Sequence, residues 1–267
     1  MKSSTTYRNE VITMKKAGNI VLAIIPPVLI LLAWWYVTNF TDTPNAILPK
    51  ISSVKDALIS TVESGQLQSD LGASLLCVLK GYAIAVVVGG ILGSLMGMFS
   101  TVKKILQPTV TCFRQIPMIA WMPLIILWFG IGDAAKIVLI VIASFFPILV
   151  NTQSGIETTP EGLIEVANLY RLNPVKKFVK VYLPHALPNI LVGLKLGLSV
   201  SWMAVVGAEL IASTTGIGYR MSNARSMMQS NILILCMLVV GLIGVLMDKI
   251  LGFVFKKLTP WEKVKTA

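Results

Sequence analysis

The chain has 267 residues, of which 55% are hydrophobic and only 13% are charged, and its formal net charge is +11. A soluble domain has about 25% charged residues, because polar side chains must cover its surface. This composition therefore excludes an ordinary water-soluble globule and a disordered chain. It indicates an integral membrane protein. The three cysteines stand apart without a C-x-x-C spacing, so they give no sign of a disulfide framework.

Long runs without a charged residue predict where the chain crosses the membrane. Five runs of 18 to 25 residues contain no Asp, Glu, Lys or Arg, at 17–41, 81–102, 115–132, 137–156 and 226–247. About 20 mostly apolar residues cross the hydrocarbon core, and in lipid they form helices that satisfy their own backbone. A sixth run, 190–212, carries Lys195 and Glu209, which lie about 21 Å apart along a helix. We therefore expect an all-α integral membrane protein with six transmembrane helices.

The first run is expected to be an uncleaved transmembrane helix. Its apolar stretch exceeds the roughly 7–15 residues of a signal-peptide core. It ends in Trp34, Trp35 and Tyr36, an aromatic cluster typical of the membrane interface. The expected organisation is a cytoplasmic N-tail at 1–18, a first helix at 19–40, an outer amphipathic segment at 41–71, a core of five further transmembrane helices at 72–256 and a cytoplasmic C-tail at 257–267.

Basic residues set the expected orientation. Of the 23 Lys and Arg residues, 16 fall in the two tails and in the loops around 103–114 and 171–180. Only six, among them Lys136 and Arg220, fall on the other side. The positive-inside rule then places both termini and the loop 157–188 in the cytoplasm. Because this charge is spread over several loops rather than one face, it does not indicate nucleic-acid binding.

Glycine and proline positions predict how the membrane helices pack and bend. Gly89, Gly93 and Gly97 form a ridge of small residues, which favours close packing within the chain over a dimer motif. Pro117, Pro123 and other prolines lie in or near the expected spans. Prolines there predict kinked or broken helices, which neighbouring helices can accommodate.

The loop 157–188 is the most informative stretch. Thr159 and Pro160 predict the start of a short helix, and the Asn173-Pro174 pair predicts its end. A second short helix follows, with apolar Val175, Phe178, Val179 and Tyr182 on one face and Lys176, Lys177 and Lys180 on the other. Such a basic amphipathic helix is expected to lie on membrane lipid. Pro184 and Pro188 are expected to break the chain after it. The pattern alone leaves open a docking surface and a solvated helical loop.

The same loop resembles the cytoplasmic motif of permease subunits of bacterial ABC importers. That motif reads Glu-Ala-Ala, three residues, Gly, nine residues, Ile, one residue, Leu-Pro. This chain has Glu165 and Ala167, then Arg171 at the glycine place, then Leu183-Pro184. Five further stretches resemble the nitrate/sulfonate/taurine branch, over roughly residues 45–255: LPKISSVKDAL, WFGIGDAAKI, FFPILVNT, LPHALPNILVGLKLGL and VVGAELIASTTGIGY.

The resemblance implies a type I ABC importer permease core with a six-helix fold. It implies a homodimer whose two copies form the path for a small solute, which a soluble binding protein delivers. An ATPase subunit would bind the ATP and dock on a cytoplasmic helix, so the permease needs no cofactor. The residues that the resemblance assigns to ATPase coupling are Glu161, Glu165, Ala167, Tyr170, Arg171, Leu183 and Pro184.

Several polar and aromatic residues in the expected spans are candidates for lining the path, with helix packing as the alternative. They are Trp121, Met122, Ser199, Trp202 and Glu209. Charges inside spans usually face a cavity or a partner. Glu209 falls near the outer end of its span, so a structural salt bridge with Arg220 is the competing interpretation.

Two other function classes fit the sequence less well. A secondary transporter or channel usually shows inverted repeats and deep ionisable residues, and the sequence shows no convincing repeat. A membrane enzyme needs catalytic or metal-binding groups, but the only histidine is His185, and neither a H-E-x-x-H motif nor a P-loop occurs. We therefore expect no catalytic residues, no metal site and no enzymatic activity in this chain.

Arg171 departs from the motif, and this suggests a local structure. A glycine at this place would end the helix with positive φ. Arginine in that region costs about 1–2 kcal/mol. We expect the helix to continue through Arg171 with negative φ and to stop at an extended Asn173, because Pro174 follows it.

Overall fold

The structure, a computed structural model, describes residue 22 and residues 24–259. The helices in chain order are Ile24–Phe40, α2 (Ile51–Glu63), α3 (Gln66–Met98), α4 (Ser100–Arg114), a 3₁₀ turn (Met118–Trp121), α5 (Met122–Phe129), α6 (Asp133–Glu157), α7 (Glu161–Leu169), α8 (Pro174–Lys177), a π turn (Phe178–Tyr182), α9 (Leu183–Ala212), α10 (Ile217–Ser226) and α11 (Ser230–Leu258). These residues contain no strand, so the predicted all-α class is confirmed. The predicted N-tail 1–18 and most of the C-tail lie outside the described residues.

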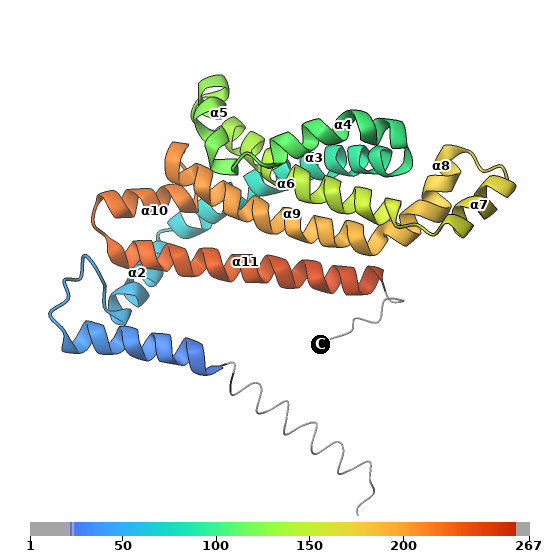
Figure 1. Ribbon diagram of the computed structural model, residues 1–267. Coiled ribbons are helices and arrows are strands. Elements are labelled where there is room, and N and C mark those ends of the chain that lie inside the picture. The colour runs from blue at the N-terminus through green and yellow to red at the C-terminus, as the bar shows by residue number, and fades with distance from the viewer. Residues whose placement is uncertain (1–21, 23, 260–267) are drawn as a thin grey trace, which may run out of the picture.

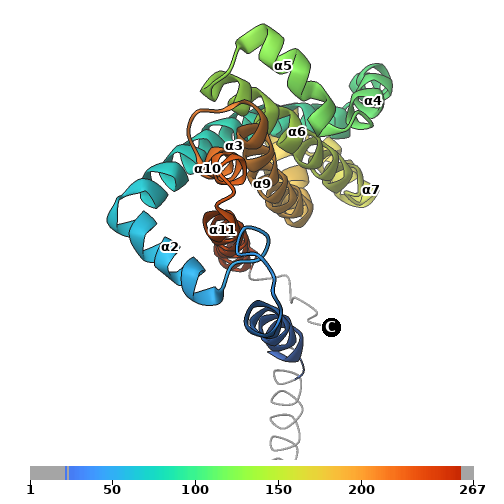
Figure 2. The same cartoon turned by 90° about the vertical axis from the view of Figure 1, so that its left-hand side faces the viewer.

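Three long helices form the centre of the molecule. Figure 1 shows α3, α6 and α9 running side by side, with α7 and α8 at one end and α10 at the other. We call these the α7 end and the α10 end. Helix α11 runs along the bundle, and α2 crosses it near the α10 end (Figure 2). Helix α2 buries Val54 and Ala57 against Leu235 of α11, as its predicted amphipathic pattern requires.

Glycines allow α3 and α6 to approach each other closely. A Cβ atom on Gly93 would lie 2.6 Å from the carbonyl oxygen of Leu149, and one on Gly97 would lie 2.7 Å from Cβ of Ile156. Side chains larger than hydrogen would push the helices apart at these points. The glycine ridge therefore packs within the chain, as predicted.

Four helices are long and apolar enough to cross a membrane: Gln66–Met98, Asp133–Glu157, Pro174–Ala212 and Ser230–Lys257. A fifth candidate is the pair Ser100–Arg114 and Met118–Phe129, which is bent by 90°. The expected span 115–132 covers only the second half of this pair, and α4 lies where a loop was expected. Pro117 lies at the break, because proline cannot continue the backbone ladder. Ile24–Phe40 is apolar but shorter, so the count of six helices stays a prediction.

The prediction that Pro184 and Pro188 break the chain is wrong. Helix α9 runs without interruption from Leu183 to Ala212, with Pro184 in its first turn and Pro188 inside it. Proline is tolerated in a first turn, because the N–H group that it lacks would have no helical partner there. The π turn that precedes α9 joins it to α8 as one bent helical segment.

Candidate functional site

Helix α7 is short and ends in a defined turn. The N–H group of Arg171 donates to the carbonyl of Asn168 at 2.9 Å, and that of Leu172 donates to the carbonyl of Ala167 at 3.0 Å. These two bonds make a Schellman motif, which needs a left-handed residue directly after the helix. Arg171 is that residue, with φ of 49°.

The prediction of negative φ at Arg171 is therefore wrong, whereas Asn173 is extended as predicted, with ψ of 160°. The two backbone bonds of the Schellman turn satisfy carbonyls at the end of α7, which offsets the strain of a non-glycine residue. The helix starts one residue later than expected. Pro160 is the N-cap, and the buried hydroxyl of Thr159 has no partner among the described residues.

Packing holds α7 firmly against the α7 end of the bundle. Ala167 is buried, and Ile164 packs with Phe178 against a small core at the start of α9. The Nζ atom of Lys177 donates to Oδ1 of Asn168 at 2.6 Å. The helix is thus anchored on one face by apolar contacts and at its end by a hydrogen bond.

The side of α7 next to this anchored face is apolar and exposed. Leu163, Val166, Leu169 and Tyr170 recur at helical spacing, and they are between 49% and 82% exposed. A helix surface that faces water would normally carry polar residues at these positions. An exposed apolar patch of this kind is typical of an interaction surface. We call these four residues the α7 stripe. Sequence reasoning named only Tyr170 from it, although the i, i+3, i+6, i+7 spacing was readable.

The structure separates the residues assigned to coupling by resemblance. Glu161 and Glu165 are exposed on α7, beside the stripe, and Tyr170 belongs to it. Ala167 points into the protein, so it supports the helix instead of presenting a surface. Leu183 and Pro184 lie in the first turn of α9, outside α7.

The five candidates for path lining do not share one cavity. Trp121 stacks on Phe113 with ring centroids 5.8 Å apart, and it faces a cavity of about 380 Å³. Met122 is buried in the core between α5 and α6. Ser199 and Trp202 line a cavity of about 320 Å³ between α9 and α11.

A more polar cavity lies between the end of α4, α6 and α9. It has a volume of about 610 Å³ and is open on one side. Arg114, Gln115 and Asn151 supply its polar groups, and the remaining wall is apolar. A second cavity of about 270 Å³ continues towards the α7 end and shares Arg114 and Val150 with the first. Arg114 therefore lies where two cavities meet, a position that the sequence did not reveal.

Glu209 occupies a fully enclosed site at the α10 end. Its carboxylate accepts hydrogen bonds from the hydroxyl of Ser74 at 2.8 and 2.9 Å and from the N–H group of Gly218 at 2.9 Å. The Nζ atom of Lys136 lies 4.0 Å away and is itself fully buried. Asp133 approaches the same Nζ at 2.7 Å. We call Ser74, Lys136, Glu209 and Gly218 the buried cluster.

The expected salt bridge between Glu209 and Arg220 is wrong. Arg220 pairs instead with Asp70 of α3 and donates to Gln66 at 2.7 Å. The positions of Gly218 and Arg220 within α10 explain this difference. Gly218 is near the start of the helix and faces Glu209, whereas Arg220 lies two residues further on and faces α3. Glu209 is enclosed by protein, so it packs the α10 end instead of lining any of these cavities.

Comparisons with known proteins agree on one family. Residues 85–260 match the family described as binding-protein-dependent transport system inner membrane component. A putative ABC transporter permease of Methanocaldococcus jannaschii is 35% identical over 92% of this chain and 93% of its own. The taurine transport system permease protein of Escherichia coli is 33% identical over 87% of this chain and 86% of its own. The sequence resemblance to the nitrate/sulfonate/taurine branch is thereby confirmed.

A solved structure shares the fold. A chain from the crystal structure of an amino acid ABC transporter superposes with a TM-score of 0.61 at 18% identity, covering 75% of this chain and 97% of that chain. The superposition matches the helical core of a type I importer permease. At this identity the likeness speaks for the fold alone.

Proposed function

Because the chain belongs to the family of binding-protein-dependent transport system inner membrane components, the permeases of ABC importers, we propose four finer points about how it works. The α7 stripe docks on an ATPase subunit. The cavities around Arg114 are this chain's half of the path. The transported solute is a small sulfonate-like anion, and a second copy of the chain completes the path.

The α7 stripe is the observation that carries the coupling proposal. Four apolar side chains lie exposed on a helix whose other face is anchored in the bundle. A rigid helix with an apolar face fits a groove in a partner protein, since that contact buries surface that water disfavours. In an ABC importer permease, the partner whose conformational changes must be transmitted to the transmembrane helices is the ATPase subunit. The α7 end is cytoplasmic in this proposal, as the distribution of basic residues predicts.

Arg114 supports the anionic solute. It stands between two cavities, and no acidic residue of the described part of the chain pairs with it. A lone guanidinium in a partly apolar cavity attracts an anion and hydrogen-bonds an oxyanion in a fixed geometry. An apolar wall suits a short aliphatic chain attached to that oxyanion. The taurine permease among the relatives transports a solute of this kind by name.

The open side of the Arg114 cavity supports the homodimer. The end of α4, the segment after it, α6 and α9 line this cavity, and it is open to the outside of the chain. A symmetric second copy would close the open side and would place two arginines around one path. The soluble binding protein would deliver the solute at the α10 end.

Introducing a negative charge into the stripe tests the coupling. Val166→Glu and Leu169→Glu should insert normally but lose ATPase co-purification and solute uptake, because each places a carboxylate in an apolar contact. Thr101→Glu is the matched control, since it adds the same charge to an exposed site in the first turn of α4. Normal uptake by both stripe variants would refute the docking assignment.

Uptake by proteoliposomes tests the solute and the path. The permease with its ATPase and binding protein should import taurine only when ATP is present. Arg114→Gln should lower the uptake rate about tenfold or more, while Arg114→Lys should keep part of the uptake rate. Failure to import any sulfonate, with ATPase activity intact, would reject the proposed solute class.

The mass of the purified complex tests the homodimer, and it should equal that of two permeases and two ATPase subunits.

A further inference from the structure

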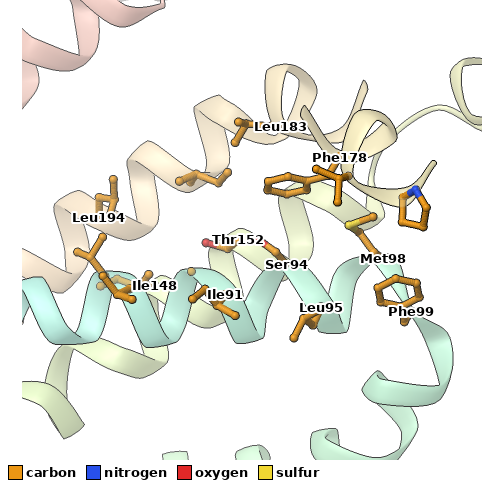
Figure 3. A pocket seen from close by; sticks show the side chains of 16 residues that line it. Ile91, Ser94, Leu95, Met98, Phe99, Ile148, Thr152, Phe178, Leu183 and Leu194 are labelled. Atoms are coloured by element: carbon orange, nitrogen blue, oxygen red, sulfur yellow. The ribbon is translucent and has the colours of Figure 1, made fainter. Parts of the chain in front are cut away.

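A second large cavity lies on the side of the bundle away from the Arg114 cavities. It has a volume of about 610 Å³, is open to one side, and runs between α3, α6, α8 and α9 (Figure 3). All of its lining residues are apolar except Ser94 and Thr152. We call this cavity the lateral groove. Its wall includes Val87 and Ile91 of α3, which are 58% and 56% exposed.

The length of the lateral groove matches one leaflet of a bilayer. Along α3 it extends from Val86 to Phe99, and along α9 from Leu183 to Leu194. At about 1.5 Å per residue these stretches measure about 20 Å and 16 Å. Half of a hydrocarbon core is about 15 Å thick. With the α7 end at the membrane surface, as the proposed topology has it, a groove of this length reaches to near the middle of the membrane.

This one-leaflet extent favours a lipid chain over a protein helix as the occupant. A transmembrane helix packs across both leaflets, whereas an acyl chain ends at the midplane. An open groove in hydrocarbon does not stay empty, because its lining would lose dispersion contacts on one side. A flexible acyl chain fills such a shape at little cost.

Basic residues stand at the surface end of the groove. Pro174, Val175 and Phe178 line it, and Lys176 and Lys180 belong to the same helical segment and are exposed. Neither lysine forms an ion pair with any residue that the structure describes. Paired lysines at the cytoplasmic surface attract the phosphate of an anionic lipid.

Thr152 supplies a second, independent sign of an occupant. Its side chain is 2% exposed, and its Oγ1 has no hydrogen-bond partner among the described residues. Figure 3 shows Thr152 close to Ser94, between α3 and α9 and below Phe178. A buried hydroxyl without a partner is costly. The ester carbonyl of a glycerophospholipid, just below its phosphate, would accept a hydrogen bond there.

We propose that the lateral groove binds one anionic glycerophospholipid, with an acyl chain against α3 and α9 and its phosphate held by Lys176 and Lys180. The lipid would fix α8 and the π turn, which connect α7 to α9 and also support α7 through Phe178. A bound lipid would thus stiffen the connection between the ATPase contact and the transmembrane bundle. Binding of the lipid does not depend on the solute or on the α7 stripe, whereas its effect on the ATPase contact rests on the proposed docking of that stripe.

A photoreactive lipid tests the site. The full permease–ATPase complex in nanodiscs is exposed to phosphatidylglycerol with a diazirine in one acyl chain, and labelled peptides are mapped by mass spectrometry. Labelling should concentrate on residues 86–99 and 183–194, and it should exceed labelling by the matching phosphatidylcholine probe about tenfold. Ile91→Trp, which fills the groove, should remove most of the label from both stretches.

Two further variants separate the roles of groove and charge. Lys176→Gln with Lys180→Gln should abolish the preference for phosphatidylglycerol while leaving some acyl labelling. Leu246→Trp is the control, because it adds the same bulk at an exposed site on α11. Equal labelling of wild type, Ile91→Trp and Leu246→Trp would overturn the proposal. So would an efficient cross-link from a cysteine at position 91 to a second permease copy, which would mean that protein covers the groove.

Discussion

The hydroxyl of Ser74 on α3 donates to both carboxylate oxygens of Glu209 on α9, at 2.8 and 2.9 Å, across 135 residues of sequence. The same hydroxyl oxygen accepts the N–H group of Ile217, the first residue of α10, at 3.1 Å. Two buried side chains thereby satisfy two N–H groups, of Ile217 and Gly218, that have no partner within α10. The α10 end is thus held by a polar site at the meeting point of four helices.

Glu209→Gln should destabilise the permease by about 1–3 kcal/mol, because Lys136 would stay buried without its second carboxylate. The loss is limited, since the Nζ atom of Lys136 also contacts Asp133 at 2.7 Å. The thermal midpoint in detergent measures it. Glu63→Gln is the control, because Glu63 is exposed at the end of α2. A midpoint that moved equally for both variants would contradict a special role for Glu209.

Lys136→Met and Glu209→Gln should show strong coupling when combined. Glu209→Gln leaves Lys136 with Asp133 as its one acidic neighbour, and Lys136→Met leaves the buried carboxylate of Glu209 without a cation, whereas the double change removes both buried charges. We expect the double variant to be more stable than the sum of the single effects by about 1 kcal/mol or more. A double-mutant cycle of unfolding midpoints measures this. Additive effects would show that the 4.0 Å approach between the two side chains carries no energy.

Local pattern was enough to predict the helical class, the glycine ridge and the break near Pro117, because each depends on residues close in sequence. The buried cluster could not be found this way. Ser74, Lys136 and Glu209 come from three helices, and nothing in their own surroundings pairs them. Lys136 was expected in a loop, since a single charge was taken to end an apolar run. In the structure it lies in the first turn of α6 and is buried.

The candidate site was predicted only in part, because a sequence motif identifies a segment of the chain but not the direction in which its side chains point. The motif points to the short helix α7, but it could not say which side of α7 faces outwards. Ala167 faces the bundle, and Leu169 faces away from it. Only packing in the folded chain decides which apolar residues of α7 are buried, because the sequence places apolar residues on more than one side of this helix. Arg114 was missed since its importance comes from two cavities that form between separate helices.

Gly93→Ala should destabilise the bundle by about 1–3 kcal/mol, because the new Cβ would press on backbone that cannot rotate away. Its ideal position is 2.6 Å from the carbonyl oxygen of Leu149. Gly72→Ala is the matched control on the same helix, where nothing lies within 4 Å. It should be neutral or stabilise by about 0.5–1 kcal/mol through helix propensity. Thermal unfolding of both variants in the same detergent checks the comparison.

Cysteine labelling tests the orientation that the basic residues predict. In a Cys112→Ser background, Ser64→Cys and Thr214→Cys should react with an impermeant maleimide on intact cells, because both sites are exposed at the α10 end. Glu165→Cys on α7 should react only after the membrane is opened. Labelling of the α7 cysteine from outside would reverse the proposed topology and with it the docking of an ATPase there.

Arg171→Gly should stabilise the last turn of α7, because glycine adopts the observed φ of 49° without strain. The left-handed conformation costs other residues about 1–2 kcal/mol, and β-branched residues tolerate it least. Hydrogen exchange at the N–H group of Leu172, which closes the Schellman turn, should therefore be slower in Arg171→Gly and faster in Arg171→Val than in the wild type. Solute uptake should survive in Arg171→Gly and fall in Arg171→Val, since the α7 stripe is held in place by this turn. The same exchange rate in all three proteins would show that the turn is not under strain at Arg171.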